Sequence, residues 1–377
     1  MTRHSDSAGA VLRAVLDHGP VPRSSVARAT RLSAASISGV AASLLDRELI
    51  REAPEAAGPP GIGRPHVPLD INPEAVAVVG AHIAVPHATV ALLDLRGQVI
   101  AQHRTPHDGR DPASVLASLA ERIRTLREKR GKRRILGVGV ATGGWVDAVT
   151  GTVVEHPALG WRDVPVGATL TAETGLPVRV DSNSRALLRA EQLFGAVAGR
   201  ARQSAVHLFV GNVVDVAFAT GGVVHQGPRS AAGAVAHLSV EGCAERCSCG
   251  RTGCLQAAVS EQTLVCRGGA TDLLSMVAAA QNGDARALAL FEERARLVGR
   301  AAALLLDLFD PEVLVVAEAG ANRIPACLEV LRAEVAAWST AGADVPEVVR
   351  ATSFPATVLA VAGGAVALDQ VYARPLS

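Results

Sequence analysis

The chain has 377 residues and a formal net charge of +1 at pH 7, and 49% of its residues are hydrophobic. This length is too great for one simple core and allows two or three domains. The near-zero charge excludes an attraction to nucleic acid that acts over the whole molecule, so any basic surface has to be local.

The cysteines and the N-terminal residues indicate the cellular compartment in which the protein is expected. Four of the six cysteines lie between Cys243 and Cys254, which indicates metal ligands in a reducing compartment more than a secreted disulfide framework. No basic-then-apolar signal peptide opens the sequence. The uncharged stretch 75–93 could span a membrane, but it holds two histidines and a proline and is rich in Val. Two adjacent buried strands are therefore the better interpretation, and we expect a cytoplasmic protein without a membrane segment.

The first 45 residues have the pattern of three short helices. Apolar residues recur at helical spacing until His18-Gly19-Pro20, which predicts the end of a first helix. Ser24 is expected to cap a second helix, and Ser33 a third with Ile37 and Val40 on its apolar face. Two short helices joined by a tight turn predict a helix-turn-helix.

A pair of strands is expected to follow these helices. Residues 49–52 and 66–71 predict the two strands, and the Gly- and Pro-rich loop 58–65 lies between them. This arrangement predicts a winged helix-turn-helix domain of α+β type over residues 1–71. Up to residue 45 the segment carries five arginines against two aspartates, which gives the head a local basic character.

Small and basic side chains make this head a candidate for binding double-stranded DNA. Small residues on the third helix allow close approach to the major groove, and the N-terminus of that helix suits a phosphate. Arg64, in the wing loop, is an extended guanidinium of the kind that enters a narrow minor groove. A helical protein-interaction module is the alternative. The candidate DNA-contacting residues are Arg23, Ser24, Arg31, Ser33, Ala35, Ser36, Ser38 and Arg64.

From residue 72 onward the pattern changes to short strands rich in Val and Ala. The same order of predicted strands and helices occurs twice. The first unit has predicted strands at 75–84, 89–95, 98–104, 135–141 and 178–181, with a helix over 111–129. The second has predicted strands at 205–210, 213–220, 223–226 and 313–317, with helices that end near 307 and 338.

Two such units facing each other predict an α/β actin-like (duplicated ribonuclease-H-like) domain with a cleft between two lobes. The first lobe is expected to cover residues 72–185 together with a C-terminal helix in 359–377. The second lobe is expected to cover residues 186–358.

A possible ligand set for a metal lies in the second lobe: His237, Cys247, Cys249 and Cys254. Gly250 and Gly253 permit the positive φ angles that a tight Cys-x-Cys-Gly-x-x-Gly-Cys knuckle needs. Three thiolates and an imidazole complete a closed tetrahedral zinc shell, which is typical of a structural site. Disulfides, or cysteines that only fill a core, are the alternatives.

This knuckle resembles the signature of the ROK family of repressors, open reading frames and sugar kinases. The family joins a glycine-histidine pair to the CxCGxxGC run, and here Ala236 replaces the glycine. The run Leu159-Gly160-Trp161-Arg162-Asp163-Val164 and the Gly63-Arg64-Pro65 of the wing are also similar to the family. The resemblance implies a regulator of the family, because the family's kinases lack the winged helix.

The resemblance also implies that kinase activity is lost. The family's phosphate loops and its adenosine turn are replaced by residues 81–87, 211–217 and 316–320, which lack the required aspartate and glycines. Asn183 stands where the family has the catalytic aspartate, and an amide cannot take the proton of a sugar hydroxyl at neutral pH. We expect no catalytic residue and no enzyme activity.

Sugar binding is a separate question. The family's two hydroxyl-binding glutamates correspond to Ala234 and Gln256, while His237 is retained. Arg185 introduces a cation in place of an amide, which suits an anionic or modified sugar or another small metabolite. The candidate effector-binding residues are Asn183, Arg185, His237 and Gln256.

These expectations combine into a ROK-type transcriptional regulator, a repressor that senses a sugar-like or other small metabolite. It would bind an inverted-repeat operator as a homodimer or tetramer, because two heads on a two-fold axis read two half-sites. A sugar kinase with an appended DNA-binding domain is the alternative function, and a DNA-bound scaffold without an effector is a third hypothesis.

Overall fold

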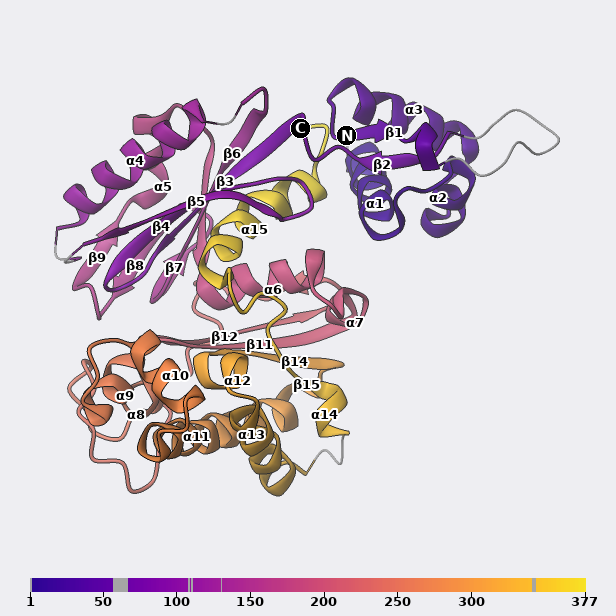
Figure 1. Ribbon diagram of the computed structural model, residues 1–377. Coiled ribbons are helices and arrows are strands. Elements are labelled where there is room, and N and C mark those ends of the chain that lie inside the picture. The colour runs from indigo at the N-terminus through magenta and orange to yellow at the C-terminus, as the bar shows by residue number, and fades with distance from the viewer. Residues whose placement is uncertain (1, 57–66, 108, 110, 130, 341–343) are drawn as a thin grey trace.

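The computed structural model describes residues 2–56, 67–107, 109, 111–129, 131–340 and 344–377. The molecule has a small N-terminal head and two lobes stacked on each other, with the head beside the first lobe (Figure 1). Within the described ranges, every helix is too short or too polar to cross a lipid bilayer.

The head is built on a core of three helices. They are α1 (Thr2–His18), α2 (Arg23–Thr30) and α3 (Ala34–Asp46). Leu12, Val26 and Val40 meet in its centre with at most 1% exposure, and each comes from a different helix. The helical spacing of the apolar residues thus produces the packing that it predicts.

One of the two predicted helix caps is correct. Ser33 precedes α3, and its hydroxyl accepts a hydrogen bond from the Ser36 amide at 3.1 Å. The cap predicted for α2 is wrong, because α2 begins at Arg23 and leaves Ser24 exposed inside the first turn. Pro22 occupies the N-cap position with φ −63°, the angle that its ring enforces, so the helix starts directly after it.

A short hairpin completes the described part of the head. β1 (Ile50–Glu52) pairs antiparallel with β2 (Leu69–Ile71), and Val21 forms a bridge to Leu69. The predicted wing loop 58–65 and Arg64 lie outside the described residues.

Each lobe contains a five-stranded sheet, and the two sheets have the same topology. The first has the order β10-β6-β3-β4-β5, and the second has the order β13-β12-β11-β14-β15. Each is an antiparallel meander of three strands extended by two parallel strands. The duplication predicted from the strand pattern, and with it the actin-like fold class, is confirmed.

Nine of the ten strands of the two sheets lie close to their predicted positions, and the edge strand β15 of the second sheet was not predicted. In the first sheet they are β3 (Val76–Ile83), β4 (His87–Leu93), β5 (Val99–Pro106), β6 (Arg134–Thr142) and β10 (Val178–Ser182). In the second they are β11 (Ser204–Val210), β12 (Val214–Thr220), β13 (Val223–Val224), β14 (Val313–Glu318) and β15 (Val349–Ala351).

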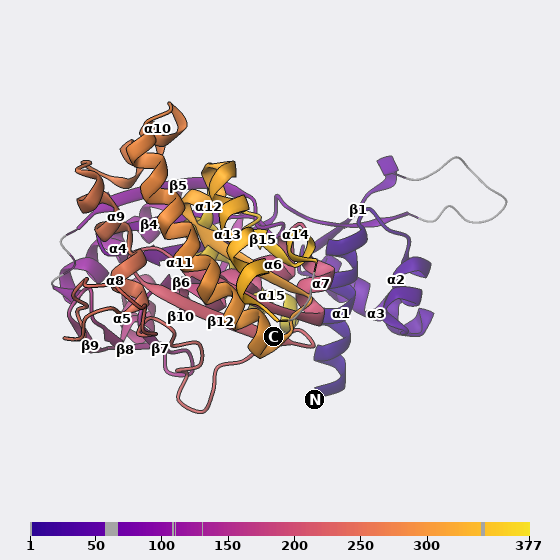
Figure 2. The same ribbon diagram turned by 90° about the horizontal axis from the view of Figure 1, so that it is seen from below.

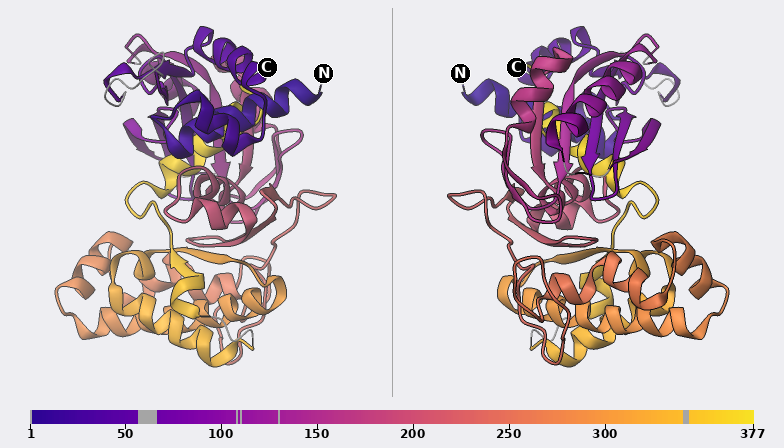
Figure 3. Two further views of the ribbon diagram at one scale, coloured as in Figure 1. Left: turned by 90° about the vertical axis from the view of Figure 1, so that its right-hand side faces the viewer. Right: turned by 90° about the vertical axis from the view of Figure 1, so that its left-hand side faces the viewer.

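Helices cover both faces of each sheet. They include α4 (Pro112–Glu128), α5 (Val166–Thr174), α6 (Asn183–Phe194), α11 (Ala285–Phe309), α13 (Pro325–Trp338) and α15 (Val358–Ala373). In β3, Val79 packs in the cluster with α4, whereas Val78 faces α15, because alternate residues point to opposite faces. Figure 3 shows the resulting stack, in which α6 and α15 lie between the two sheets.

Some elements of the body were not predicted. A small sheet of β7 (Trp145–Asp147), β8 (Thr152–His156) and β9 (Trp161–Val164) lies beside the first lobe. Short helices are α7 (Ala198–Gln203), α8 (Leu255–Val259), α9 (Glu261–Gly268), α10 (Leu273–Gln281), α12 (Ala319–Arg323) and α14 (Val345–Val348). The expected division between the lobes at residue 185 falls inside α6.

Helix α15 packs against β3 and β6 with almost no space between the backbones. A Cβ atom built on Gly363 would lie 2.3 Å from the Ala81 carbonyl oxygen, and one on Gly80 would lie 2.4 Å from the Gly364 amide. Only glycines allow this approach. On its other side α15 is tied to α6, because Arg189 bonds to Asp369 at 3.1 Å.

The head shares a hydrophobic core with the first lobe and α15. Leu12 of α1, Leu93 of β4 and Leu368 of α15 belong to one cluster of buried side chains. The Tyr372 hydroxyl donates to the Leu95 carbonyl at 2.6 Å, and Arg202 pairs with Asp17 of α1 at 2.9 Å. Figure 2 shows α1 beside the C-terminal end of the chain. The head is thus seated on the body by packing as well as by polar contacts.

Candidate metal centre, ligand cavity and nucleic-acid interface

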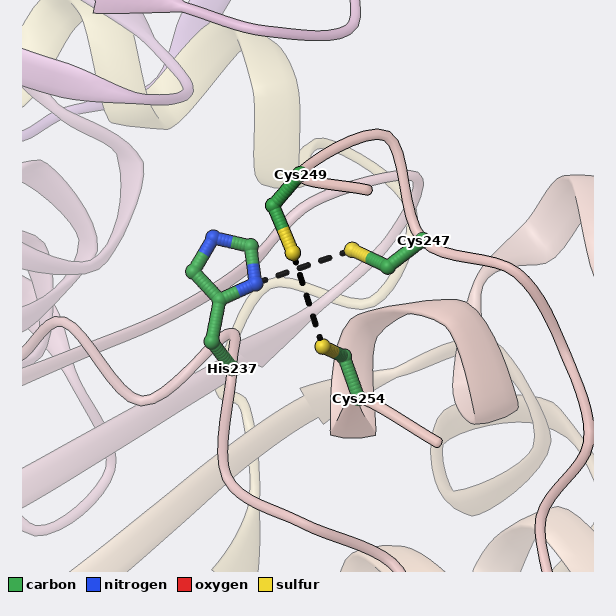
Figure 4. A group of neighbouring side chains, drawn as sticks. All are labelled: His237, Cys247, Cys249 and Cys254. Carbon is green, nitrogen blue, oxygen red and sulfur yellow. Dashed lines mark hydrogen bonds between the residues drawn. The ribbon is translucent and has the colours of Figure 1, made fainter. Parts of the chain in front are cut away.

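The four predicted metal ligands converge on one point. The ligand atoms of His237, Cys247, Cys249 and Cys254 all lie within 4.8 Å of one another. His237 Nδ1 is 3.6 Å from Cys247 Sγ, and Cys249 Sγ is 3.7 Å from Cys254 Sγ (Figure 4). All six cysteines are free thiols, so the disulfide alternative is wrong.

These two separations, 3.6 and 3.7 Å, have the values that a tetrahedral zinc shell requires. Ligands at about 2.3 Å for sulfur and about 2.0 Å for nitrogen place neighbouring ligand atoms about 3.5–3.8 Å apart. A disulfide needs about 2.05 Å between its sulfurs, so 3.7 Å fits a metal and not a covalent bond. The residues present therefore fit a closed structural metal site.

Backbone hydrogen bonds and two glycines build this knuckle. Gly250 and Gly253 have φ angles of 88° and 75°, as predicted for the turns. The Cys247 amide bonds to the Arg251 carbonyl at 2.8 Å, and the Leu255 amide bonds to the Leu238 carbonyl at 2.7 Å. These bonds hold the histidine segment beside the last cysteine.

The electrostatics of the knuckle favour metal ligation at Cys249 and His237, whereas burial raises the pKa of Cys254 to about 11, so this thiol has to lose its proton when a metal binds. Arg251 Nε donates to Cys249 Sγ at 3.4 Å, which lowers the pKa of that thiol to about 6. Burial lowers the pKa of His237, which keeps its imidazole neutral. Thiolate and neutral imidazole are the protonation states that bind a metal.

A cavity of about 240 Å³ adjoins the metal centre. His237, Gln256 and Arg185 line it, as expected for effector-binding residues, whereas Asn183 is not among its lining residues. In Figure 4 the second ring nitrogen of His237 points away from the cysteines. Sequence reasoning missed Asp215, Ser230 and Trp145 as lining residues. Asp215 is an acidic residue within an otherwise apolar strand, which was the available signal.

Arg185 does not offer a free cation to this cavity. Its side chain is only 3% exposed, and its guanidinium pairs with Asp181 and donates to the carbonyls of Ser230 and Val146 at 3.0 and 2.9 Å. It connects α6 to strand β7, through Val146, and to the loop that holds Ser230. The expectation that Arg185 selects an anionic ligand is therefore not supported, because its hydrogen bonds are already made within the protein.

Asp215 is one of two acidic residues that line the cavity, and Glu155 is the other. Burial raises the pKa of Asp215, and this effect is opposed by hydrogen bonds from Ser184 and by the charge of Arg185. Gln256 Oε1 accepts from the Val214 amide at 3.2 Å, which leaves its NH₂ group for other partners. The wall thus combines carboxylate, amide and imidazole groups.

In the stretches that the resemblance assigns to nucleotide binding and catalysis, side chains of the protein interact with one another. His82 Nε2 bonds to Asn183 Oδ1 at 2.9 Å, so the residue at the catalytic position is engaged. The buried side chains of Arg294 and Glu318 form an ion pair in the former adenosine turn. A Cβ on Gly143 would lie 2.7 Å from a methyl group of Val213, so the two lobes touch there.

The predicted DNA-contacting residues gather around α2, α3 and the turn between them. Ser24, Arg31, Ser33, Ala35, Ser36 and Ser38 are all exposed. Arg31 ends α2 in the left-handed conformation, with φ 56°. Arg23 pairs with Glu52 of β1 at 2.8 Å, so its charge is partly used within the head. Gly39 has open space around it, so no side chain projects from α3 at this position.

The chain can now be compared with known proteins. Residues 78–369 match the model of the ROK family. Transcriptional regulator Rv0485 of Mycobacterium tuberculosis is 34% identical over 391 residues, which cover 99% of this chain and 87% of the relative. The DNA-binding transcriptional repressor Mlc of Escherichia coli is 26% identical over 328 residues, with 82% of this chain and 80% of the relative covered.

Solved structures give the same fold. A ROK family transcriptional regulator, described as a homologue of the Escherichia coli MLC protein, superposes with a TM-score of 0.78 at 23% identity. This match covers 98% of this chain and 97% of that chain. A ROK family glucokinase from Streptomyces griseus, in complex with glucose and AMPPNP, gives a TM-score of 0.68 at 22% identity and covers 76% of this chain and 98% of its own.

The fold and the site define a two-lobed actin-like protein with a helix-turn-helix head and an altered kinase cleft. The chain belongs to the ROK family. Within the family it is a transcriptional regulator, because a relative that matches 99% of this chain, head included, carries that name. The predicted family is confirmed, and so is a regulator in preference to a kinase.

Proposed function

We propose that the chain represses transcription by binding an inverted-repeat operator through α3. The observation that carries the proposal is the exposed N-terminal half of α3, with small side chains at Ala35, Ser38 and Gly39 and a capped N-terminus. Small residues let the helix enter the major groove, and the free amides of a helix N-terminus suit a phosphate.

A homo-oligomer would present two such heads. Exposed large apolar side chains on neighbouring helices support it: Leu304 and Leu308 on α11 and Trp338 on α13 are 45%, 65% and 59% exposed. Leu304 and Leu308 are one helical turn apart, so they lie on one face. An apolar face of this kind is typical of a subunit interface. The proposed assembly is a homodimer or tetramer joined through this face.

Zinc is the proposed metal of the His-Cys₃ centre. It would stiffen the knuckle beside the cavity and take no part in chemistry, because four protein ligands leave no open position. The zinc content of the purified protein, measured by mass spectrometry after exhaustive dialysis, tests this assignment.

The cavity beside the metal centre is the proposed effector site. Its lining of Asp215, Gln256 and His237 suits a small molecule with hydroxyl groups, such as a neutral sugar or a derivative. The pathway to DNA would run through α6, which lines the cavity with Arg185 and is tied to α15 by Arg189 and Asp369. An effector changes DNA affinity only through different affinities for two arrangements of the heads.

Fluorescence anisotropy tests the operator proposal. The protein is titrated on the DNA upstream of its own gene and on a scrambled duplex across a salt series. We expect a preference for the upstream DNA at physiological salt. Equal binding that weakens steeply with salt would mean that only phosphates are contacted.

A matched pair of variants ties the binding to α3. Ala35→Glu places a carboxylate on the exposed face of α3, and we expect at least a tenfold loss of DNA affinity, because it repels the phosphates. Ala336→Glu makes the same change on an exposed position of α13, and we expect no loss. Equal affinity of the two variants would remove α3 from the interface.

A further inference from the structure

A second cavity lies at the seam between the head and the first lobe. Its volume is about 370 Å³, within the range of small-molecule sites, about 300–1,000 Å³. The head contributes Arg47, from the end of α3, and the body contributes residues of β6, β10 and the C-terminal end of α15. Figure 1 shows the C-terminus between the first lobe and the head. We call it the seam cavity.

The seam cavity is lined by a concentration of positive charge. Arg47, Arg134, Arg179 and Arg374 contribute to its wall, and none of its described lining residues is Asp or Glu. Across the described ranges, none of these four guanidinium groups forms an ion pair with an Asp or Glu side chain, although Arg47 Nη1 donates to an oxygen of the terminal residue Ser377 at 3.3 Å. By contrast, arginines of exposed helices elsewhere pair with glutamates, as Arg267 does with Glu293.

Two of these arginines already have backbone partners that hold them in place. Arg47 Nη2 donates to the Leu376 carbonyl at 2.8 Å, and Arg134 Nη2 donates to the Arg47 carbonyl at 2.9 Å. These bonds join head and body across the cavity. The guanidinium groups of Arg179 and Arg374 have no hydrogen bond within the described part of the chain, so their donors are available.

The rest of the lining is aliphatic. Val78 of β3, Leu136 of β6 and Val371 of α15 contribute side chains, and Pro177 closes the edge beside β10. An apolar surface next to unpaired cations favours a molecule with both characters: its aliphatic part buries apolar area and its anionic group accepts charge-assisted hydrogen bonds from the arginines.

We propose that the seam cavity binds an amphiphilic organic anion, a carboxylate or a phosphate carried on an aliphatic body. Arg179 and Arg374 hold the anionic group, and Val78, Leu136 and Val371 contact the aliphatic part. Arg47 and Arg134 fix the two sides of the cavity relative to each other. This site is separate from the cavity beside the metal centre.

The ligand would touch the head and the body at once. Its binding therefore favours the head position of this structure over any position in which Arg47 moves away from β10. An effect of the anion on DNA affinity rests on the proposed operator function, whereas binding of the anion to the seam cavity does not. The two parts of the proposal are accordingly measured separately.

Calorimetry with defined probes tests the binding. Decanoate and decyl phosphate are titrated below their micelle concentrations into the full chain, with 1-decanol as a probe without charge and inorganic phosphate as a probe without a tail. We expect binding of decanoate, decyl phosphate or both, and at least tenfold weaker binding of the other two. The better of the two ten-carbon anions identifies the anionic group.

Variants locate the binding at the seam. Arg179→Gln and Arg374→Gln, alone and together, remove charges that have no described partner, so folding should be preserved. We expect about a tenfold loss of anion affinity for each, because a charge-assisted hydrogen bond contributes about 1.5–3 kcal/mol. Arg323→Gln, at an exposed arginine of α12, is the matched control and should bind like the wild type.

Several outcomes would overturn the proposal: no binding at millimolar anion, equal binding of 1-decanol, or unchanged affinity in the double variant. If the variants lose DNA affinity while no anion binds, these arginines contact DNA phosphates and the seam cavity is not a ligand site. DNA titrations with and without the bound anion then measure the coupling; a severalfold change that disappears in the double variant is expected.

Discussion

His207 lies in β11, the central strand of the second sheet, and is fully buried. Neither of its ring nitrogens has a hydrogen-bond partner in the described part of the chain. Burial alone lowers its pKa from 6.5 to about 3, because the charged ring would lose its hydration without any compensation. The residue therefore stays neutral in the folded protein and becomes protonated on unfolding in mild acid.

His207→Leu should reduce the acid sensitivity of the protein. Below about pH 6.5 His207 is protonated in the unfolded chain, whereas in the folded chain it stays neutral down to about pH 3. The free energy of unfolding is therefore unaffected by protonation of this residue above pH 6.5 and decreases as the pH falls below that value. Between pH 7.5 and pH 5 the wild type should lose about 2 kcal/mol more than the variant. Urea unfolding at both pH values measures the difference, and the exposed residue His103 serves as the control in His103→Leu.

Gly39→Ala should separate stability from DNA binding. Gly39 lies inside α3 with no atom within 4 Å of an added Cβ, so alanine should stabilise the helix by about 0.5–1 kcal/mol. The same methyl group would project toward the DNA and weaken operator binding severalfold. Gly199→Ala in α7, which is equally open, should change stability without changing DNA affinity. Unimpaired operator binding by Gly39→Ala would place this face of α3 away from the groove.

At the scale of the element, α15 is the part that joins the cleft to the head. It packs on β3 and β6 through glycines, is tied to α6 by Arg189 and Asp369, and places Tyr372 against the core of the head. The sequence allowed the prediction that a C-terminal helix packs on the first lobe. The contact with the head was not predicted, because the pattern of one helix does not reveal which distant segment covers its end.

Gly363→Ala should be strongly destabilising. The added Cβ would lie 2.3 Å from the carbonyl oxygen of Ala81, so the helix has to move away from β3. We expect a loss of about 2–4 kcal/mol in the free energy of unfolding, typical of overpacking in a core. Gly199→Ala, which has room for its methyl group, is the control and should not be destabilised. Similar unfolding midpoints for the two variants would contradict the close contact.

The knuckle is the second element whose integrity can be tested. Cys254→Ser removes one of the four ligands and the residue that precedes α8, so we expect loss of the metal and a destabilisation of about 2 kcal/mol or more. Metal analysis and thermal unfolding measure the two effects. Cys266→Ser changes an exposed cysteine outside the cluster and should leave both unchanged. Retention of stoichiometric metal by Cys254→Ser would show that the ligand set is different.

At the scale of the whole molecule, the predicted strands and the duplicated sheets match the structure because runs of Val and Ala mark buried strands clearly. The three-strand sheet of β7, β8 and β9 was missed, because its strands are short and only some of their side chains are buried. Among the candidate site residues, the four predicted metal ligands come together in the structure, and their spacing, the two glycines and the upstream histidine were the signals that indicated this cluster. Arg185 was misjudged, because its partners Val146 and Ser230 are distant in sequence.

Leu308→Glu should dissociate the proposed oligomer. The side chain is 65% exposed on α11 beside Leu304, and a carboxylate there would be buried without a partner in an interface. We expect a shift toward monomer in sedimentation velocity and weaker binding to a two-site operator. Val149→Glu changes an 80% exposed apolar residue between β7 and β8 and should keep the wild-type mass. An unchanged mass of Leu308→Glu would move the interface to another face.

The shared core of the head, the first lobe and α15 has a consequence for synthesis on the ribosome. The head and the strands of the first sheet are made first, yet the helix that completes their core follows only after residues 183–357. At about 5–20 residues per second, this stretch takes roughly ten to thirty seconds to translate. During that time the nascent chain exposes the apolar surface that α15 later covers, and it is a natural client for chaperones that bind such surfaces. A regulator assembled in this way gains a firmly seated head only when nearly all of its chain has emerged.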